Sequence, residues 1–152
     1  MILAGRNQVG LTEEEIERCL LAWKILCGEK ERELVIDEAH QHSSRTRFNE
    51  TSGKVHLGAD VKPGSGIEAN SRMSVLACLA HELAHAERFE IGFQRPIEFP
   101  DNLIDESETS LHASFMPVLS STEREDLVGD ARDRLSQWFA ERFAEKRKEL
   151  DI

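Results

Sequence analysis

The sequence predicts an α+β fold in which a small three-stranded antiparallel sheet packs against helices. Long segments repeat their apolar residues at intervals of three and four, two short segments flank a glycine-containing turn, and a further short run is rich in branched residues. A chain of 152 residues is long enough for one domain with its own core. We expect a single domain over residues 1–152, with its core at about 30–120 and flanking helices at 12–27 and 122–148.

The first helix is expected to begin at Thr12, because the hydroxyl of Thr12 and the carboxylate of Glu15 have the spacing of a capping box. Gly28 is expected to end it, since glycine readily adopts the backbone conformation that follows a helix. The helix should cover the core with the apolar residues Ile16, Leu20, Trp23, Leu26 and Cys27, which follow helical spacing.

Three short segments predict the strands of the sheet. Residues 33–37 are the run rich in branched residues, which is typical of a strand. Residues 45–49 and 54–59 flank the turn and predict a hairpin. In the second arm of the hairpin His56 should face away from its two apolar neighbours, because successive side chains of a strand alternate.

The segment from residue 71 to about 90 is expected to form one helix, capped by Asn70 or Ser71. Its apolar stripe repeats at helical intervals and consists of Leu76, Leu79, Leu83 and Ala86.

This helix carries the sequence His-Glu-Leu-Ala-His. Positions four apart project from the same face of a helix, so His81 and His85 can direct a ring nitrogen at one metal ion. Glu82 lies one step round the helix, where a general base for a metal-held water would be needed. The pattern therefore predicts a zinc hydrolase.

Two further helices are expected after an irregular segment at 92–100, which contains two prolines. One runs from about 102 to 115. Thr122 and Glu125 form a capping box for the last helix, whose charged tail, residues 145–152, should fray. The helix at about 102–115 should end at Pro117. Its inward-packing residues should be Leu103, Ile104, Leu111 and Phe115.

A catalytic zinc ion has three protein ligands and one open position, so a third ligand is required after His85. Glu106 and Glu108 are two apart on a helix and cannot share a face. Glu108 does share one with Asp105 and His112. We therefore predict Glu108 as the ligand, with Asp105 and His112 orienting it or an imidazole, and keep Glu106 as the alternative.

The residues around both motifs resemble the ImmA/IrrE-type metallopeptidases, which are compact gluzincin-like proteins. The resemblance covers roughly residues 50–120. It implies a zincin-like fold, a Zn²⁺ ion held by His81, His85 and Glu108, and Glu82 as the base. The matching pieces are Arg72 with Leu79-Ala80-His81-Glu82-Leu83-Ala84-His85, Glu106-Ser107-Glu108-Thr109-Ser110-Leu111-His112-Ala113, and Met116-Pro117.

We therefore expect a zinc-dependent metallopeptidase that cleaves a peptide bond of a protein substrate, with Glu82 as general base. The family resemblance suggests a separate helix-turn-helix repressor as a partner. The chain contains no Tyr, so His112 is predicted to stabilise the oxyanion, with His56 and Arg88 as alternatives. A catalytically idle binding module that holds a protein partner, and a hydrolase of another amide or small molecule, remain as other hypotheses.

The composition of the chain limits which cellular compartment and which binding partners we expect. The net charge of −10, with basic residues interleaved among acidic ones, argues against direct nucleic-acid binding. There is no apolar run of about 18 residues for a membrane span, and residues 1–10 lack the features of a signal peptide. An odd number of cysteines without C-x-x-C spacing predicts reduced, mostly buried thiols in a cytoplasmic protein; they are Cys19, Cys27 and Cys78.

Overall fold

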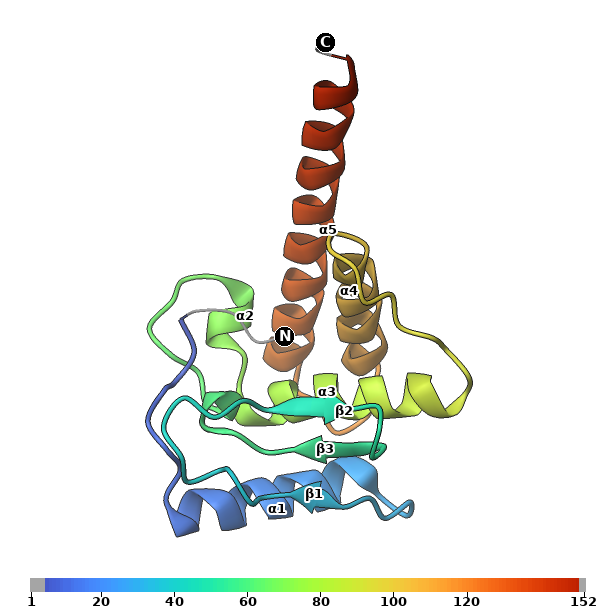
Figure 1. The fold of residues 1–152 in the computed structure, drawn as a ribbon. Coiled ribbons are helices and arrows are strands. Elements are labelled where there is room, and N and C mark those ends of the chain that lie inside the picture. Colours follow the sequence, from blue (N-terminus) through green and yellow to red (C-terminus); the bar gives the residue numbers. More distant parts are fainter. Residues whose placement is uncertain (1–4, 151–152) are drawn as a thin grey trace.

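A computed structural model of the chain describes residues 5–150, so the first four of the ten residues considered for a signal peptide lie outside it. Within this range, five α-helices, one short 3₁₀ helix and a three-stranded sheet form a mixed α+β fold (Figure 1). None of the helices in residues 5–150 is long and apolar enough to cross a membrane.

The sheet is mixed, not purely antiparallel as the sequence predicts. Its strands are β1 (Leu34–Val35), β2 (Arg47–Asn49) and β3 (Lys54–His56), in the order β1-β3-β2. The expected hairpin of β2 and β3 is confirmed, but β1 pairs in parallel with β3. Residues 36–53, which include β2, connect β1 to β3. This connection is long enough to return the chain, so β3 runs beside β1 in the same direction.

Helix α1 (Glu13–Cys27) confirms both predicted ends. Thr12 and Glu15 form the capping box, and Gly28 ends the helix with a positive φ of 62°. The indole nitrogen of the buried Trp23 donates to the carbonyl oxygen of Arg32 at 2.8 Å, which holds the chain leaving α1 against the helix. All three cysteines are free; Cys19 and Cys78 are buried, and Cys27 is half-buried.

The predicted helix at 71–90 is two helices, α2 (Ala69–Arg72) and α3 (Val75–Glu90). Met73 has an extended backbone between them, and Ser74, instead of Asn70 or Ser71, caps α3. The buried guanidinium of Arg6 donates to the carbonyl oxygen of Met73 at 2.6 Å and to that of Asn70 at 2.9 Å. These carbonyl groups bind Arg6 and are therefore not used to continue a helix.

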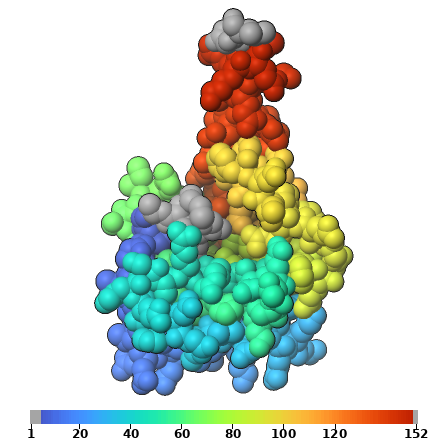
Figure 2. Space-filling model, in the orientation of Figure 1, coloured from blue at the N-terminus to red at the C-terminus, as the bar shows by residue number. Residues whose placement is uncertain are grey.

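The last two helices are α4 (Asn102–Ser114) and α5 (Ser121–Leu150). Ser120 and Glu123 exchange the two hydrogen bonds of a capping box at the start of α5, where the sequence predicts Thr122 and Glu125. The sequence predicts a frayed tail at 145–152; residues 151–152 lie outside the described range, and residues 145–150 belong to α5, which is helical to Leu150. Its C-terminal part stands out from the body of the molecule (Figure 2).

Helix α3 lies at the centre of the fold. On one side it meets the sheet and α1 in an apolar core that includes Trp23, Val55 and Leu79. On the other side it meets α4 and the first turns of α5 (Figure 1). Small residues allow this second approach: Ala77, Ala80, Ala84 and Ala113 are all fully buried.

Candidate metal centre

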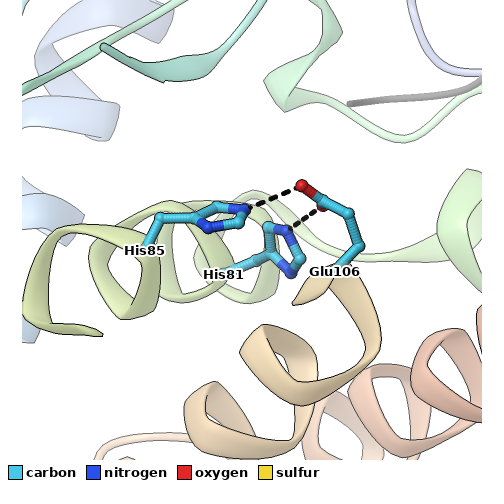
Figure 3. Close-up of side chains that lie close together, drawn as sticks. All are labelled: His81, His85 and Glu106. Atoms are coloured by element: carbon cyan, nitrogen blue, oxygen red, sulfur yellow. Dashed lines mark hydrogen bonds and ion pairs between the residues drawn. The ribbon is translucent and has the colours of Figure 1, made fainter. Parts of the chain in front are cut away.

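Two helices bring two imidazoles and one carboxylate together inside the protein (Figure 3). His81 and His85 come from α3 and Glu106 comes from α4, and one ligand atom from each lies within 4.8 Å of the others. Nε2 of His81 is 2.9 Å from one oxygen of Glu106, and Nε2 of His85 is 3.1 Å from the other. All three residues are 3% exposed. This buried group could hold a metal ion.

The prediction that Glu108 faces the histidines is wrong, and the alternative, Glu106, lies in its place. The side chain of Glu108 is 49% exposed and its carboxylate binds Arg88 at 3.0 Å. As expected, the two glutamates do not share a face of the helix.

The error comes from the buried face of α4, which is not the apolar face that the sequence suggests. Leu111 and Phe115 are 42% and 82% exposed. Small polar residues form the buried face of α4 instead. Their burial is possible because each of their hydroxyl groups has a hydrogen-bond partner inside the protein. Ser107 donates to the carbonyl oxygen of Ala131, Thr109 to that of Asp105, Ser110 to the carboxylate of Asp130, and Ser114 to the carbonyl oxygen of Leu111.

The predicted oxyanion-stabilising residues do not meet the cluster. His112 is half-buried, and its Nε2 lies 3.5 Å from Glu87 instead. His56 lies on β3, next to the buried Val55, so its side chain points to the other face of the sheet. Arg88 is bound to Asp105 and Glu108 and lies over the ring of Phe93.

Two hydroxyl groups on α4 fix the orientation of the histidine rings. The Ser110 hydroxyl lies 2.8 Å from Nδ1 of His81 and gives its own proton to Asp130 at 2.6 Å. It can therefore accept the proton of Nδ1, so Nε2, which faces Glu106, is the nitrogen at which a metal ion would take the place of a proton.

Thr109 stands in the same relation to His85. Its hydroxyl donates to the carbonyl oxygen of Asp105 at 2.7 Å and lies 3.4 Å from Nδ1 of His85. Burial lowers the pKa of His85 and so favours its neutral form, although the hydrogen bond with Glu106 acts in the opposite direction. A neutral imidazole is the form that binds metal ions.

Glu106 supplies the negative charge of the group. Burial alone would raise its pKa, but the hydrogen bonds from His81 and His85 outweigh burial and hold the pKa well below its usual range. Arg95 reaches one carboxylate oxygen at 3.1 Å, and Arg134 lies 3.4 Å from the other. Glu106 is therefore an ionised carboxylate held between two histidines and two arginines.

Glu82 lies beside the cluster at a small cavity. The cavity has a volume of about 210 Å³, and it is lined by Glu82, His85, Arg95 and the four residues 45–48 that lead into and form β2. Burial raises the pKa of the Glu82 carboxyl above its usual value. Its side chain forms no hydrogen bond or ion pair with the residues that the structure describes. Larger cavities exist elsewhere, along α1, but they are not next to this cluster.

A comparison of the chain with protein-family models, curated proteins and solved structures gives no match. The residues His81, His85 and Glu106 themselves therefore carry the inference of a metal site. Sequence reasoning identified His81, Glu82 and His85 but missed Arg95, Thr109, Ser110, Asp130 and Arg134. A usable signal is the spacing of small residues on α4, because Ser107, Ser110 and Ser114 recur at intervals of three and four.

Proposed function

We propose that this protein is a zinc-dependent metallopeptidase of the zincin-like type that the ImmA/IrrE resemblance implies. The observation that carries the proposal is the buried group of His81, His85 and Glu106, with Glu82 at the adjoining cavity. Two imidazoles and one carboxylate are a ligand set of catalytic zinc sites, in which one position stays open for water or substrate. Nδ1 of each histidine lies next to the hydroxyl of Ser110 or Thr109, and Nε2 of each faces the carboxylate of Glu106.

A zinc ion held there would polarise the carbonyl group of a peptide and lower the pKa of a water molecule toward 7. Glu82 is proposed to take the proton from that water and to give it to the departing amine. Burial raises the pKa of Glu82, which makes its carboxylate a stronger base toward that water than an exposed carboxylate would be.

The substrate is proposed to lie along β2, which is an edge strand of the sheet. An extended peptide can add to such an edge through backbone hydrogen bonds. The cavity favours this placement, because four consecutive residues, 45–48, form one wall and Glu82 and His85 form another. A separate helix-turn-helix repressor remains the proposed partner.

The alternative is a catalytically idle zincin-like module that holds a protein partner. The small cavity favours it, because about 210 Å³ is below the roughly 300 Å³ at which ligand pockets usually begin. Glu82 speaks against it, since a binding module needs no base beside the metal.

The test compares wild type with Glu82→Gln after loading with zinc. Both proteins should contain one zinc ion per chain, and only wild type should hydrolyse unfolded casein. Loss of activity with retained zinc supports a base role for Glu82. Equal zinc content and no hydrolysis of casein or of candidate repressors by wild type would favour the binding module.

A further inference from the structure

The proposed reaction requires a group that stabilises the carbonyl oxygen as it becomes negative. The chain has no Tyr, and His112, His56 and Arg88 are all bound or directed elsewhere. The candidates are therefore the side chains that contact the cluster from the cavity side.

Arg95 meets this condition. It belongs to the segment between α3 and α4, lines the cavity with Glu82 and His85, and is 25% exposed. Its Nη2 lies 3.1 Å from the same Glu106 oxygen that reaches Nε2 of His85. The guanidinium therefore stands at the border between the metal cluster and the cavity.

Other contacts hold the guanidinium in place. Nε of Arg95 donates to the buried carboxylate of Asp105 at 3.1 Å and lies 3.5 Å from Glu50, in the turn that follows β2. Arg95 thus links α4 to the hairpin across the cavity. A donor fixed in this way needs little reorganisation when charge develops next to it.

The other arginines near the site do not combine these features. Arg134 also approaches Glu106, but its side chain is only 5% exposed and it is bound to Asp130. Arg45 and Arg47 line the cavity, but neither forms a hydrogen bond or ion pair with Glu106 or either histidine; Arg47 lies 3.4 Å from Glu38 instead.

We propose that Arg95 is a catalytic residue whose guanidinium donates a hydrogen bond to the carbonyl oxygen of the scissile peptide as that oxygen becomes negative. The inference rests on the proposed peptidase function. Arginine suits the role, because it stays protonated at any working pH and offers several N–H donors in one plane. No proton leaves Arg95, and Glu82 alone exchanges the proton of the attacking water.

The experiment uses the zinc-loaded full chain and three substitutions: Arg95→Ala, Arg95→Lys, and, as a control, Arg18→Ala, which changes an exposed arginine on α1 away from the cavity. Two readouts are measured, the kinetics of casein hydrolysis and the affinity for two probes. One probe is a phosphinic dipeptide, whose tetrahedral anionic phosphorus imitates the reacting carbon. The other is the matching dipeptide amide, which has an ordinary carbonyl group.

Arg95→Ala should lower kcat by about 100-fold to 1,000-fold, with KM changed less than about 3-fold. It should also weaken binding of the phosphinic dipeptide by about 100-fold while binding of the amide is nearly unchanged. Arg95→Lys should recover part of both losses. Arg18→Ala should resemble wild type, and all four proteins should hold one zinc ion per chain.

Two results would overturn the assignment. If Arg95→Ala loses zinc or binds both probes more weakly by the same factor, Arg95 only holds Glu106 in place. If Arg95→Ala and Arg18→Ala behave alike, Arg95 has no special part in the reaction. Both differ from failure of the peptidase proposal, in which wild type itself cleaves no casein and binds neither probe.

Discussion

The hydroxyl group of Ser110 lies 2.8 Å from Nδ1 of His81. Because that hydroxyl donates its proton to Asp130, it can only accept from the ring, so Nδ1 of His81 carries the proton of this hydrogen bond. Asp130 is in turn held by Nε of Arg134 at 2.9 Å. A chain of three buried side chains from α4 and α5 thus determines which nitrogen of His81 can bind a metal ion.

Removing this hydroxyl should weaken metal binding. Ser110→Ala leaves the Nδ1 proton without its partner, and the loss of an outer hydrogen bond to a metal-binding histidine typically costs about 10-fold to 100-fold in affinity. Competition with a zinc-sensitive dye measures the dissociation constant. Ser107→Ala is the matched control, because Ser107 lies on the same helix but donates to the carbonyl oxygen of Ala131. Equal zinc affinities of the two variants would show that Ser110 does not orient His81.

The two glutamates of α4 should differ in their effect on metal binding. Glu106→Gln removes the charged member of the buried group, so zinc affinity should fall by more than the roughly 100-fold seen for outer residues. Glu108→Gln should leave it nearly unchanged, because that carboxylate is half exposed and binds Arg88. Calorimetric titration of the metal-free proteins with zinc gives both values. Loss of zinc from Glu108→Gln but not from Glu106→Gln would reverse the assignment made from the structure.

Local signals in the sequence predict much of this fold. The capping box at Thr12, the hairpin and the i, i+4 pair of His81 and His85 each depend on a few neighbouring residues. The sequence misleads where distant contacts decide the outcome. Glu106 faces inward because α4 buries hydroxyl groups whose partners lie on α5 or within α4.

Two further differences between the predicted and the observed fold also come from contacts between residues far apart in the sequence. The helix expected at 71–90 is interrupted where Arg6, more than 60 residues earlier, binds the carbonyl oxygens of Asn70 and Met73. The parallel pairing of β1 with β3 depends on a connection of many residues and not on a turn. No pattern within a short stretch of sequence reports such contacts.

Arg6 should be essential to stability. Its buried guanidinium donates to five backbone carbonyl oxygens, those of Asp60, Val61, Asn70, Ser71 and Met73. Arg6→Ala would leave several buried acceptors without partners, each at a cost of about 1–3 kcal/mol, so we expect a total loss of at least about 3 kcal/mol.

Urea unfolding of the metal-free protein measures this loss, with Arg18→Ala as the control. Arg18 is exposed on α1, and its removal should change the unfolding free energy by no more than about 0.5 kcal/mol. Similar unfolding free energies for the two variants would contradict the role assigned to Arg6.

The ion pairs of Glu90 should make stability depend on pH in acid. Its carboxylate binds Arg32 at 2.5 Å and Lys30 at 2.6 Å, and the hydrogen bonds from Arg32 and then Lys30 lower its pKa from 4.5 to about 2. A lowered folded-state pKa means that the stabilisation is complete above the unfolded value of 4.5 and is lost as the pH falls toward 2. The side chain is 41% exposed, so solvent screening limits the effect to about 1 kcal/mol. We therefore expect Glu90→Gln to lower the unfolding free energy of the metal-free protein at pH 7, and the difference from wild type to shrink near pH 2.5. The exposed Glu31→Gln is the control and should match wild type at both pH values. A difference for Glu90→Gln that persists unchanged at pH 2.5 would refute the lowered pKa.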